Sequence, residues 1–139
     1  MIYLDAAALV KMIRIEAQTS DLVAWLNDHP DEQLVASAVV EVEVPRALCR
    51  DQPEALGSVG RTLSRLVRFD IDAAVRATAA AYTERHLRSL DAIHLATADQ
   101  LIASGKRLIA FVTYDQRLAA SSAAAALPVI APGLPATTH

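Results

Sequence analysis

MIYLDAAALVK, residues 1–11, is the stretch that decides the fold. Its apolar run Ile2-Tyr3-Leu4 ends at Asp5, which predicts a short buried strand. After Asp5, apolar residues recur at helical spacing, namely Ala8, Leu9, Met12 and Ile13. A strand that passes directly into a helix is typical of proteins built on a parallel sheet.

The same alternation continues along the rest of the chain. Further strands are predicted at 33–36, 67–71, 108–112 and 129–130. The helices predicted between them run from Thr19 or Ser20 to Asn27, from a Ser37 cap toward Arg50, from Pro53 to near Leu66, from an Asp72 cap through Arg85, from Ser89 to Ala103, and from Asp115 into the alanine run. We therefore expect an α/β fold of three layers, α/β/α, with a central, mainly parallel sheet of four to five strands.

The composition indicates one domain that does not enter a membrane. The 139 residues are 53% hydrophobic and 21% charged, which suits a single packed core and excludes a disordered chain. We assign residues 1–131 to this domain and residues 132–139 to a loose surface tail. No uncharged apolar run approaches the roughly 20 residues of a membrane helix, and no export segment opens the chain, so we expect a cytoplasmic protein.

The charge and the lone cysteine exclude two further kinds of site. The net charge of −3 argues against a general basic surface for nucleic acid, so a polyanion must be held locally, by arginines such as Arg46. Cys49 has no second cysteine to pair with and no histidine nearby to share a metal. We expect Cys49 to be a small buried apolar residue.

Four acids occupy the positions where a parallel sheet gathers its functional groups. Asp5 and Asp115 directly follow predicted strands, and Glu43 and Asp91 lie in the first half of predicted helices. Because ligand sites of such folds lie beyond the carboxyl ends of the strands, the four carboxylates should converge there. Clustered carboxylates repel each other unless a cation neutralises them, and an all-oxygen set selects Mg²⁺ or Mn²⁺ over zinc. Such an ion suits phosphodiester hydrolysis.

Structural explanations compete with this interpretation. Asp91 and Asp115 can each complement or cap the start of a helix, whereas Asp5 between apolar neighbours is costly to bury without a partner. Glu41 and Glu43 would face different sides of one helix, so one of them is expected on the surface.

Two residues on the helix of Asp91 are interpreted structurally. His94, one turn away between Ile93 and Leu95, is predicted to be a packed residue with one satisfied ring nitrogen rather than a proton carrier. Asp99 is more than two turns from Asp91 and is therefore predicted to be peripheral.

Four segments resemble the PIN-domain family, in particular its VapC toxins, across nearly the whole chain. They are MIYLDAAALVK (1–11), SAVVEVEVPRAL (37–48), LRSLDAIHLATA (87–98) and FVTYDQRL (111–118). The resemblance implies that Asp5 and Asp91 are the principal metal ligands and that Glu43 and Asp115 complete the acidic pocket. It favours Glu43 over Glu41 because Glu43 stands three residues before Arg46-Ala47-Leu48.

The resemblance also implies a function. Similar proteins are Mg²⁺-dependent endoribonuclease toxins of type II toxin–antitoxin pairs, in which Mn²⁺ can replace Mg²⁺. They cut structured RNA, often transfer or ribosomal RNA, and leave a 3′-hydroxyl and a 5′-phosphate. A cognate VapB-type antitoxin silences them, and they commonly form homodimers. Arg46 would support the reaction by stabilising negative charge on the phosphate.

The sequence departs from the family pattern at two places. Ala6 and Ala7 stand where the family usually carries a hydroxyl that orients the acids, and Thr113 is a candidate for supplying it instead. Pro45 interrupts the glutamate helix, where we expect a kink. One alternative stays open to test, namely a noncatalytic PIN-like module that binds an antitoxin or RNA. An aspartyl phosphotransfer enzyme is set aside, because such sites need a second aspartate where Ala7 stands.

Overall fold

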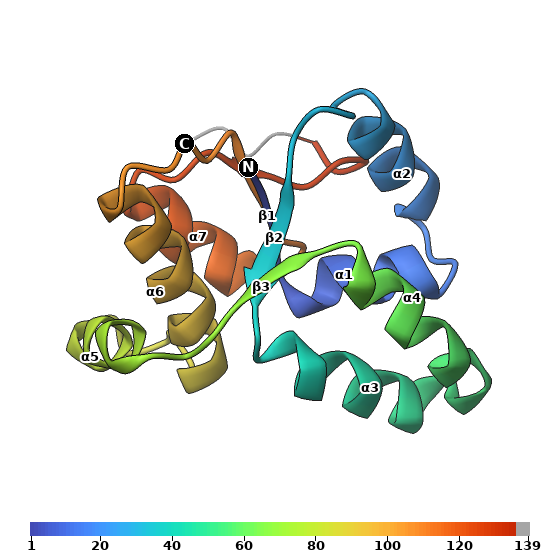
Figure 1. Cartoon of the computed structure of the whole chain (residues 1–139), viewed down its shortest axis with the longest axis horizontal. Coiled ribbons are helices and arrows are strands. Elements are labelled where there is room, and N and C mark those ends of the chain that lie inside the picture. Colours follow the sequence, from blue (N-terminus) through green and yellow to red (C-terminus); the bar gives the residue numbers. More distant parts are fainter. Residues whose placement is uncertain (136–139) are drawn as a thin grey trace.

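The chain folds around one five-stranded sheet in which all neighbouring strands run parallel (Figure 1). The computed structural model describes residues 1–135. The sheet order is β3-β2-β1-β4-β5, with β1 at Ile2–Leu4, β2 at Leu34–Ser37, β3 at Val67–Phe69, β4 at Ala110–Val112 and β5 at Val129–Ile130. The predicted α/β class is confirmed, and the sheet is parallel throughout.

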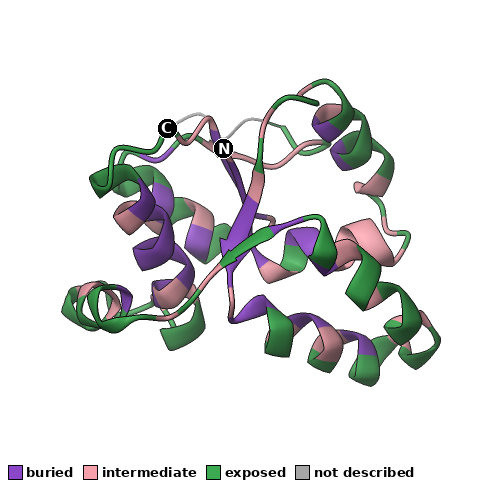
Figure 2. Cartoon of the chain, in the orientation of Figure 1, coloured by how far each residue is buried: buried purple, intermediate pink, exposed green. Residues whose placement is uncertain are grey.

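Helices cover both faces of the sheet, as the predicted three layers require. They are α1 (Ala6–Ile13), α2 (Thr19–Asn27), α3 (Val40–Asp51), the 3₁₀ helix η1 (Pro53–Ser58), α4 (Val59–Ser64), α5 (Ala73–Ala81), α6 (Ser89–Ala103) and α7 (Gln116–Ala124). In Figure 1, α1 to α4 lie on one side of the sheet and α5 to α7 on the other. The central strands are buried between them, while the outer helix faces are exposed (Figure 2).

The alternation of side chains along β1 divides the core into two halves. Ile2 and Leu4 pack into the cluster beneath α1 to α4, whereas Tyr3 packs into the cluster beneath α6 and α7. Tyr3 lies in register with Val35 on one side and Phe111 on the other, so β1 is the middle strand. The residue that follows β1 therefore emerges at the centre of the carboxyl edge of the sheet.

Two predicted helix ends differ from the structure. The Ser37 cap is wrong: Ser37 is the last residue of β2, its hydroxyl accepts from the N–H of Val39 at 3.2 Å, and α3 begins only at Val40. Helix α5 starts as predicted with Asp72 as its cap, but it ends at Ala81 rather than Arg85. The backbone of Tyr82 is extended, and its hydroxyl donates to Asp99 of α6. Asp99 is thus bonded to the residue that follows α5.

Helix α3 carries two further findings. It continues through Pro45 without a break in the helical span. Its buried residues Val40, Val44 and Leu48 form one stripe, and Cys49 lies about 100° round the helix from Leu48. Cys49 is consequently exposed, which contradicts its predicted burial.

The predicted tail, residues 132–139, is described only in part, because residues 136–139 lie outside the described range. Its first residues contact the domain: the hydroxyl of Tyr114 donates to the carbonyl of Pro132 at 2.8 Å. Gly133 has a φ of 91°, and a Cβ there would lie 2.7 Å from a carboxylate oxygen of Asp21. Among the described helices, not one has the length and apolar character needed to cross a bilayer.

Candidate active site

Asp5 occupies the point where β1 passes into α1. Its side chain is buried, with the residue only 3% exposed, and both of its oxygens accept hydrogen bonds. Oδ1 caps α1 by accepting from the N–H of Ala8 at 2.9 Å, and Oδ2 accepts from the hydroxyl of Thr113 at 2.5 Å. Burial raises the pKa of the Asp5 carboxyl above its ordinary value, although Thr113 and Ala8 oppose the shift.

Thr113 links Asp5 to the end of the neighbouring strand. It follows β4 directly and is 1% exposed. Besides donating to Asp5, its hydroxyl oxygen accepts from the N–H of Asp115 at 3.1 Å. Asp115 in turn caps α7, because its Oδ1 accepts from the N–H groups of Arg117 and Leu118. One hydroxyl thus holds both acids that follow strands.

Asp91 comes from the first turn of α6, on the opposite side of the sheet from α3. Burial raises the pKa of its carboxyl; the negative charges of Asp115 and Glu43 raise it further, while His94 and Arg88 oppose the rise. His94 likewise lowers the pKa of Asp5, and Glu43 raises it. The four predicted acids therefore share one electrostatic environment, as the topology leads one to expect.

Glu43 and Glu41 separate clearly in the structure. Glu43 turns inward from α3, and its Oε1 lies 2.7 Å from Nε2 of His94. Glu41 is exposed and pairs with Arg68 at 3.4 Å. The expectation that one of the two is a surface residue is confirmed, and the inward residue is Glu43.

His94 is buried as predicted, but both of its ring nitrogens have partners rather than one. Besides Glu43, it contacts the hydroxyl of Tyr3 through Nδ1 at 2.6 Å. Tyr3 is fully buried and stacks on Phe111 with ring centroids 4.8 Å apart. Sequence reasoning missed this connection; the available signal was that His94 lies one turn from Asp91, on the same side of α6.

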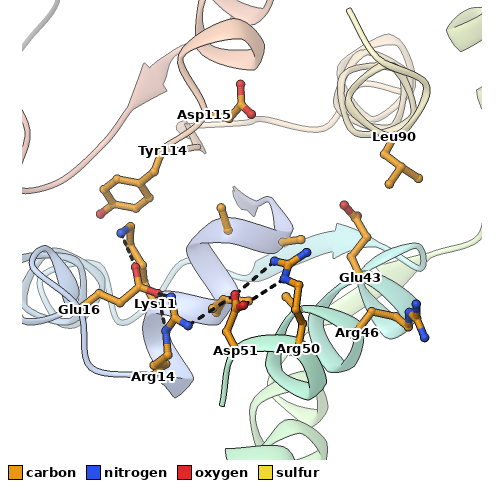
Figure 3. Close-up of a pocket in the computed structure, with 14 residues that line it drawn as sticks. Lys11, Arg14, Glu16, Glu43, Arg46, Arg50, Asp51, Leu90, Tyr114 and Asp115 are labelled. Carbon is orange, nitrogen blue, oxygen red and sulfur yellow. Dashed lines mark hydrogen bonds and ion pairs between the residues drawn. The ribbon is translucent and has the colours of Figure 1, made fainter. Parts of the chain in front are cut away.

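A cavity of about 730 Å³ opens beside the acids (Figure 3). Glu43 and Asp115 line it, and its apolar wall includes Ala6, Ala7 and Leu90. Asp5 and Asp91 are the immediate chain neighbours of Ala6 and Leu90, and neither is itself among the lining residues.

Basic side chains form the opposite rim of the cavity, and most of them are already paired. Lys11 and Arg14 each lie 2.7 Å from a carboxylate oxygen of Glu16. Arg50 is hydrogen-bonded to Asp51. Arg46, one turn from Glu43, is exposed at the rim, and no acid within residues 1–135 pairs with it.

The acids suit an oxygen-seeking divalent cation in their chemistry. Within the described part of the chain, no three histidine, cysteine, aspartate or glutamate side chains are close enough to form a closed metal cage. Mg²⁺ does not need one, because it binds through one or two carboxylates and completes its shell with water and substrate phosphate. The raised pKa values of Asp5 and Asp91 are the relevant observation, since a bound cation would relieve the unfavourable charge at both.

Residues 2–123 of this chain match the sequence pattern of the family described as PIN domain. The chain belongs to the PIN-domain family. Ribonuclease VapC35 of Mycobacterium tuberculosis is 52% identical over 133 residues, which cover 96% of this chain and 98% of VapC35. This places the chain among the VapC-type members of the family.

Solved PIN-domain structures share the fold at low sequence identity. The crystal structure of Mycobacterium tuberculosis VapC20, described as a sarcin-ricin loop cleaving toxin, has a TM-score of 0.70 at 16% identity. The superposed region covers 87% of this chain and 95% of the VapC20 chain. VapBC2 from Rickettsia felis, solved bound to a DNA fragment from the promoter of the pair, has a TM-score of 0.65 at 16% identity and covers 95% and 99%. These likenesses confirm the PIN fold.

Proposed function

We propose that this PIN-domain chain is the Mg²⁺-dependent endoribonuclease toxin of a type II toxin–antitoxin pair. Its reaction would hydrolyse phosphodiester bonds of structured RNA, transfer or ribosomal, to a 3′-hydroxyl and a 5′-phosphate. The observation that carries the proposal is the buried, doubly hydrogen-bonded Asp5, which shares one electrostatic environment with Asp91, Glu43 and Asp115. Near-full-length identity of 52% to a protein named as a ribonuclease supports it.

The residues divide the work by position. Asp5 and Asp91 would hold the ion, which when bound supplies a positive centre for a phosphate oxygen and acidifies a water. Glu43 has one oxygen on His94, and its other oxygen can accept a proton of the attacking water. Asp115 borders the same cavity and would orient that water from the opposite side. Arg46 would donate to the phosphate as its negative charge grows.

The proposal includes partners. A VapB-type antitoxin encoded with this chain would silence it, in keeping with the VapC names of its relatives. We also propose that the chain forms a homodimer. We further propose that it acts in the cytoplasm, where transfer and ribosomal RNA are found. Co-purification with the neighbouring gene product tests the first of these, and light scattering of the isolated chain tests the second.

RNA cleavage by matched variants tests the function. Wild-type protein incubated with bulk transfer and ribosomal RNA and Mg²⁺ should give discrete fragments, and sequencing of their ends should show 3′-hydroxyl and 5′-phosphate termini. Asp5→Asn, Asp91→Asn and Glu43→Gln should abolish these fragments. Glu41→Gln, which changes the exposed neighbour on the same helix, is the matched control and should cleave like wild type.

Calorimetric titration with Mn²⁺ separates the enzyme from the noncatalytic alternative. The proposal expects heat of binding that Asp5→Asn removes, and cleavage that EDTA stops and Mg²⁺ restores. A folded wild-type protein that binds no divalent ion and cuts no RNA would instead be a PIN-like binding module.

A further inference from the structure

The connection from the core to Glu43 goes beyond the acidic pocket itself. We propose that His94, itself held by Tyr3, is a positioning residue that fixes the carboxylate of Glu43 so that one oxygen stays directed at the cavity. The inference rests on the proposed function, because it assigns how Glu43 is prepared for that reaction. It does not make His94 a catalytic residue, since His94 faces Glu43 and Tyr3 rather than the cavity.

The burial of the three groups increases along the chain of hydrogen bonds. The side chain of Glu43 is 19% exposed, that of His94 is 2% exposed, and Tyr3 is fully buried. The two hydrogen bonds measure 2.7 Å and 2.6 Å. They join β1, α3 and α6, which lie in different layers of the fold (Figure 1). The side chain of Glu43 is therefore held by contacts that reach the central strand of the sheet, and not by its own helix alone.

The contact with His94 engages only one of the two carboxylate oxygens of Glu43. Nδ1 of His94 faces the Tyr3 hydroxyl, and a proton on Nε2 is donated to Oε1 of Glu43. Oε1 is thereby engaged, and among the described residues none hydrogen-bonds Oε2.

Helix α3 gives a reason why Glu43 needs an anchor from outside. Pro45 has no N–H, so the carbonyl of Glu41 lacks the helical hydrogen bond that a residue at 45 would normally give it. Glu43 lies between these two residues, in a turn with one backbone bond missing. The bond from His94 of α6 restrains the side chain where the helix itself restrains it least.

The first test separates positioning from folding by combining substitutions. His94→Leu alone takes the imidazole away from the buried Tyr3 hydroxyl, whereas His94→Leu with Tyr3→Phe removes both polar groups and leaves an apolar pair. The double variant should fold, and its kcat on an RNA oligonucleotide that the wild type cleaves should fall about tenfold to a hundredfold, with KM within about threefold. His94→Gln, whose amide can still donate to Glu43, should recover much of the kcat.

A matched control changes a tyrosine hydroxyl bond outside the site. Tyr82→Phe removes the bond from Tyr82 to Asp99, between α5 and α6, and should leave kcat unchanged. A readout independent of cleavage is the imidazole ¹⁵N spectrum of His94. It should report a proton on Nε2 in the wild type, and Glu43→Gln should shift the Nε2 signal.

The outcomes distinguish the two levels of the proposal. A folded His94→Leu/Tyr3→Phe protein with wild-type kcat overturns the positioning inference and leaves the proposed function standing. A His94 spectrum indifferent to Glu43→Gln also overturns the inference. Wild-type protein that cuts no RNA overturns the proposed function, and the reaction for which Glu43 is positioned falls with it.

Discussion

Replacing Asp5 by asparagine should inactivate the protein and, without a divalent ion, make it more stable. Asp5 is 3% exposed, and burial raises the pKa of its carboxyl despite the hydrogen bonds from Thr113 and Ala8. The folded state therefore favours the neutral form of this group. Asparagine is neutral, has the same shape, and caps a helix as well as aspartate does, so the bond from the N–H of Ala8 can be kept.

The sign and size of the effect follow from proton linkage. A carboxyl with a raised pKa in the folded state binds its proton more tightly there, so the charged group lowers stability once the pH rises above the unfolded value of about 3.9. Each unit of such a shift is worth about 1.4 kcal/mol. We expect Asp5→Asn to raise the free energy of unfolding at neutral pH, and each kcal/mol gained would raise Tm by about 3 °C for a chain of this size. The gain should shrink as the pH falls through the raised pKa of Asp5, because the wild-type carboxyl then becomes protonated in the folded state.

Differential scanning calorimetry in EDTA at pH 7.5 and pH 5 measures this gain. Addition of Mg²⁺ at ten times its Kd should then stabilise the wild type by about 1.4 kcal/mol, which is seen as a higher Tm. The Tm of the variant should stay nearly unchanged. Asp31→Asn, an exposed aspartate in the loop before β2, is the control and should change neither measurement. A variant less stable than wild type in EDTA at pH 7.5 would refute the burial argument. Equal stabilisation of both proteins by Mg²⁺ would refute the role of Asp5 at the ion.

Three further predictions concern neighbouring features. Thr113→Val should cost about 1–3 kcal/mol in urea unfolding, because an oxygen of buried Asp5 loses its donor, and RNA cleavage should fall about tenfold or more; Thr113→Ser should retain most of both. Gly133→Ala should lower stability by about 1–2 kcal/mol in the same assay, since φ there is 91° and the new Cβ would crowd the Asp21 carboxylate; an unchanged midpoint would contradict this. Chelation with EDTA should stop cleavage without unfolding the protein by circular dichroism, because the ion neutralises the site rather than the core.

Much of the fold could be predicted because its signals are local. Each strand is a short apolar run followed within a few residues by a helix, and this spacing alone implies parallel pairing. The position of Asp5 followed from the end of the first run, and that of Asp115 from the end of the fourth. The Cys49 error was avoidable, since the stripe Val40, Val44 and Leu48 already fixes which side of α3 is buried.

The link from Tyr3 through His94 to Glu43 could not be predicted in the same way. Tyr3 and His94 are 91 positions apart, and His94 and Glu43 are 51 apart. Their meeting depends on how far α6 and α3 each extend past the edge of the sheet. No periodicity in the sequence encodes that distance, so the residues read separately as a core tyrosine and a packed histidine.

The loss of hydroxyls at Ala6 and Ala7 shows why a site should be compared by its atoms rather than by aligned positions. Oδ2 of Asp5 is buried and needs a donor, whichever segment supplies it. Strands β1 and β4 are paired, and the N–H of Asp5 lies 3.3 Å from the carbonyl of Val112, so residue 113 begins beside Asp5. The hydroxyl of Thr113, just beyond β4, therefore supplies the donor to Asp5 that Ala6 and Ala7 lack. The cavity wall is left small and apolar at Ala6 and Ala7, while the bond from Thr113 still supports the carboxylate of Asp5.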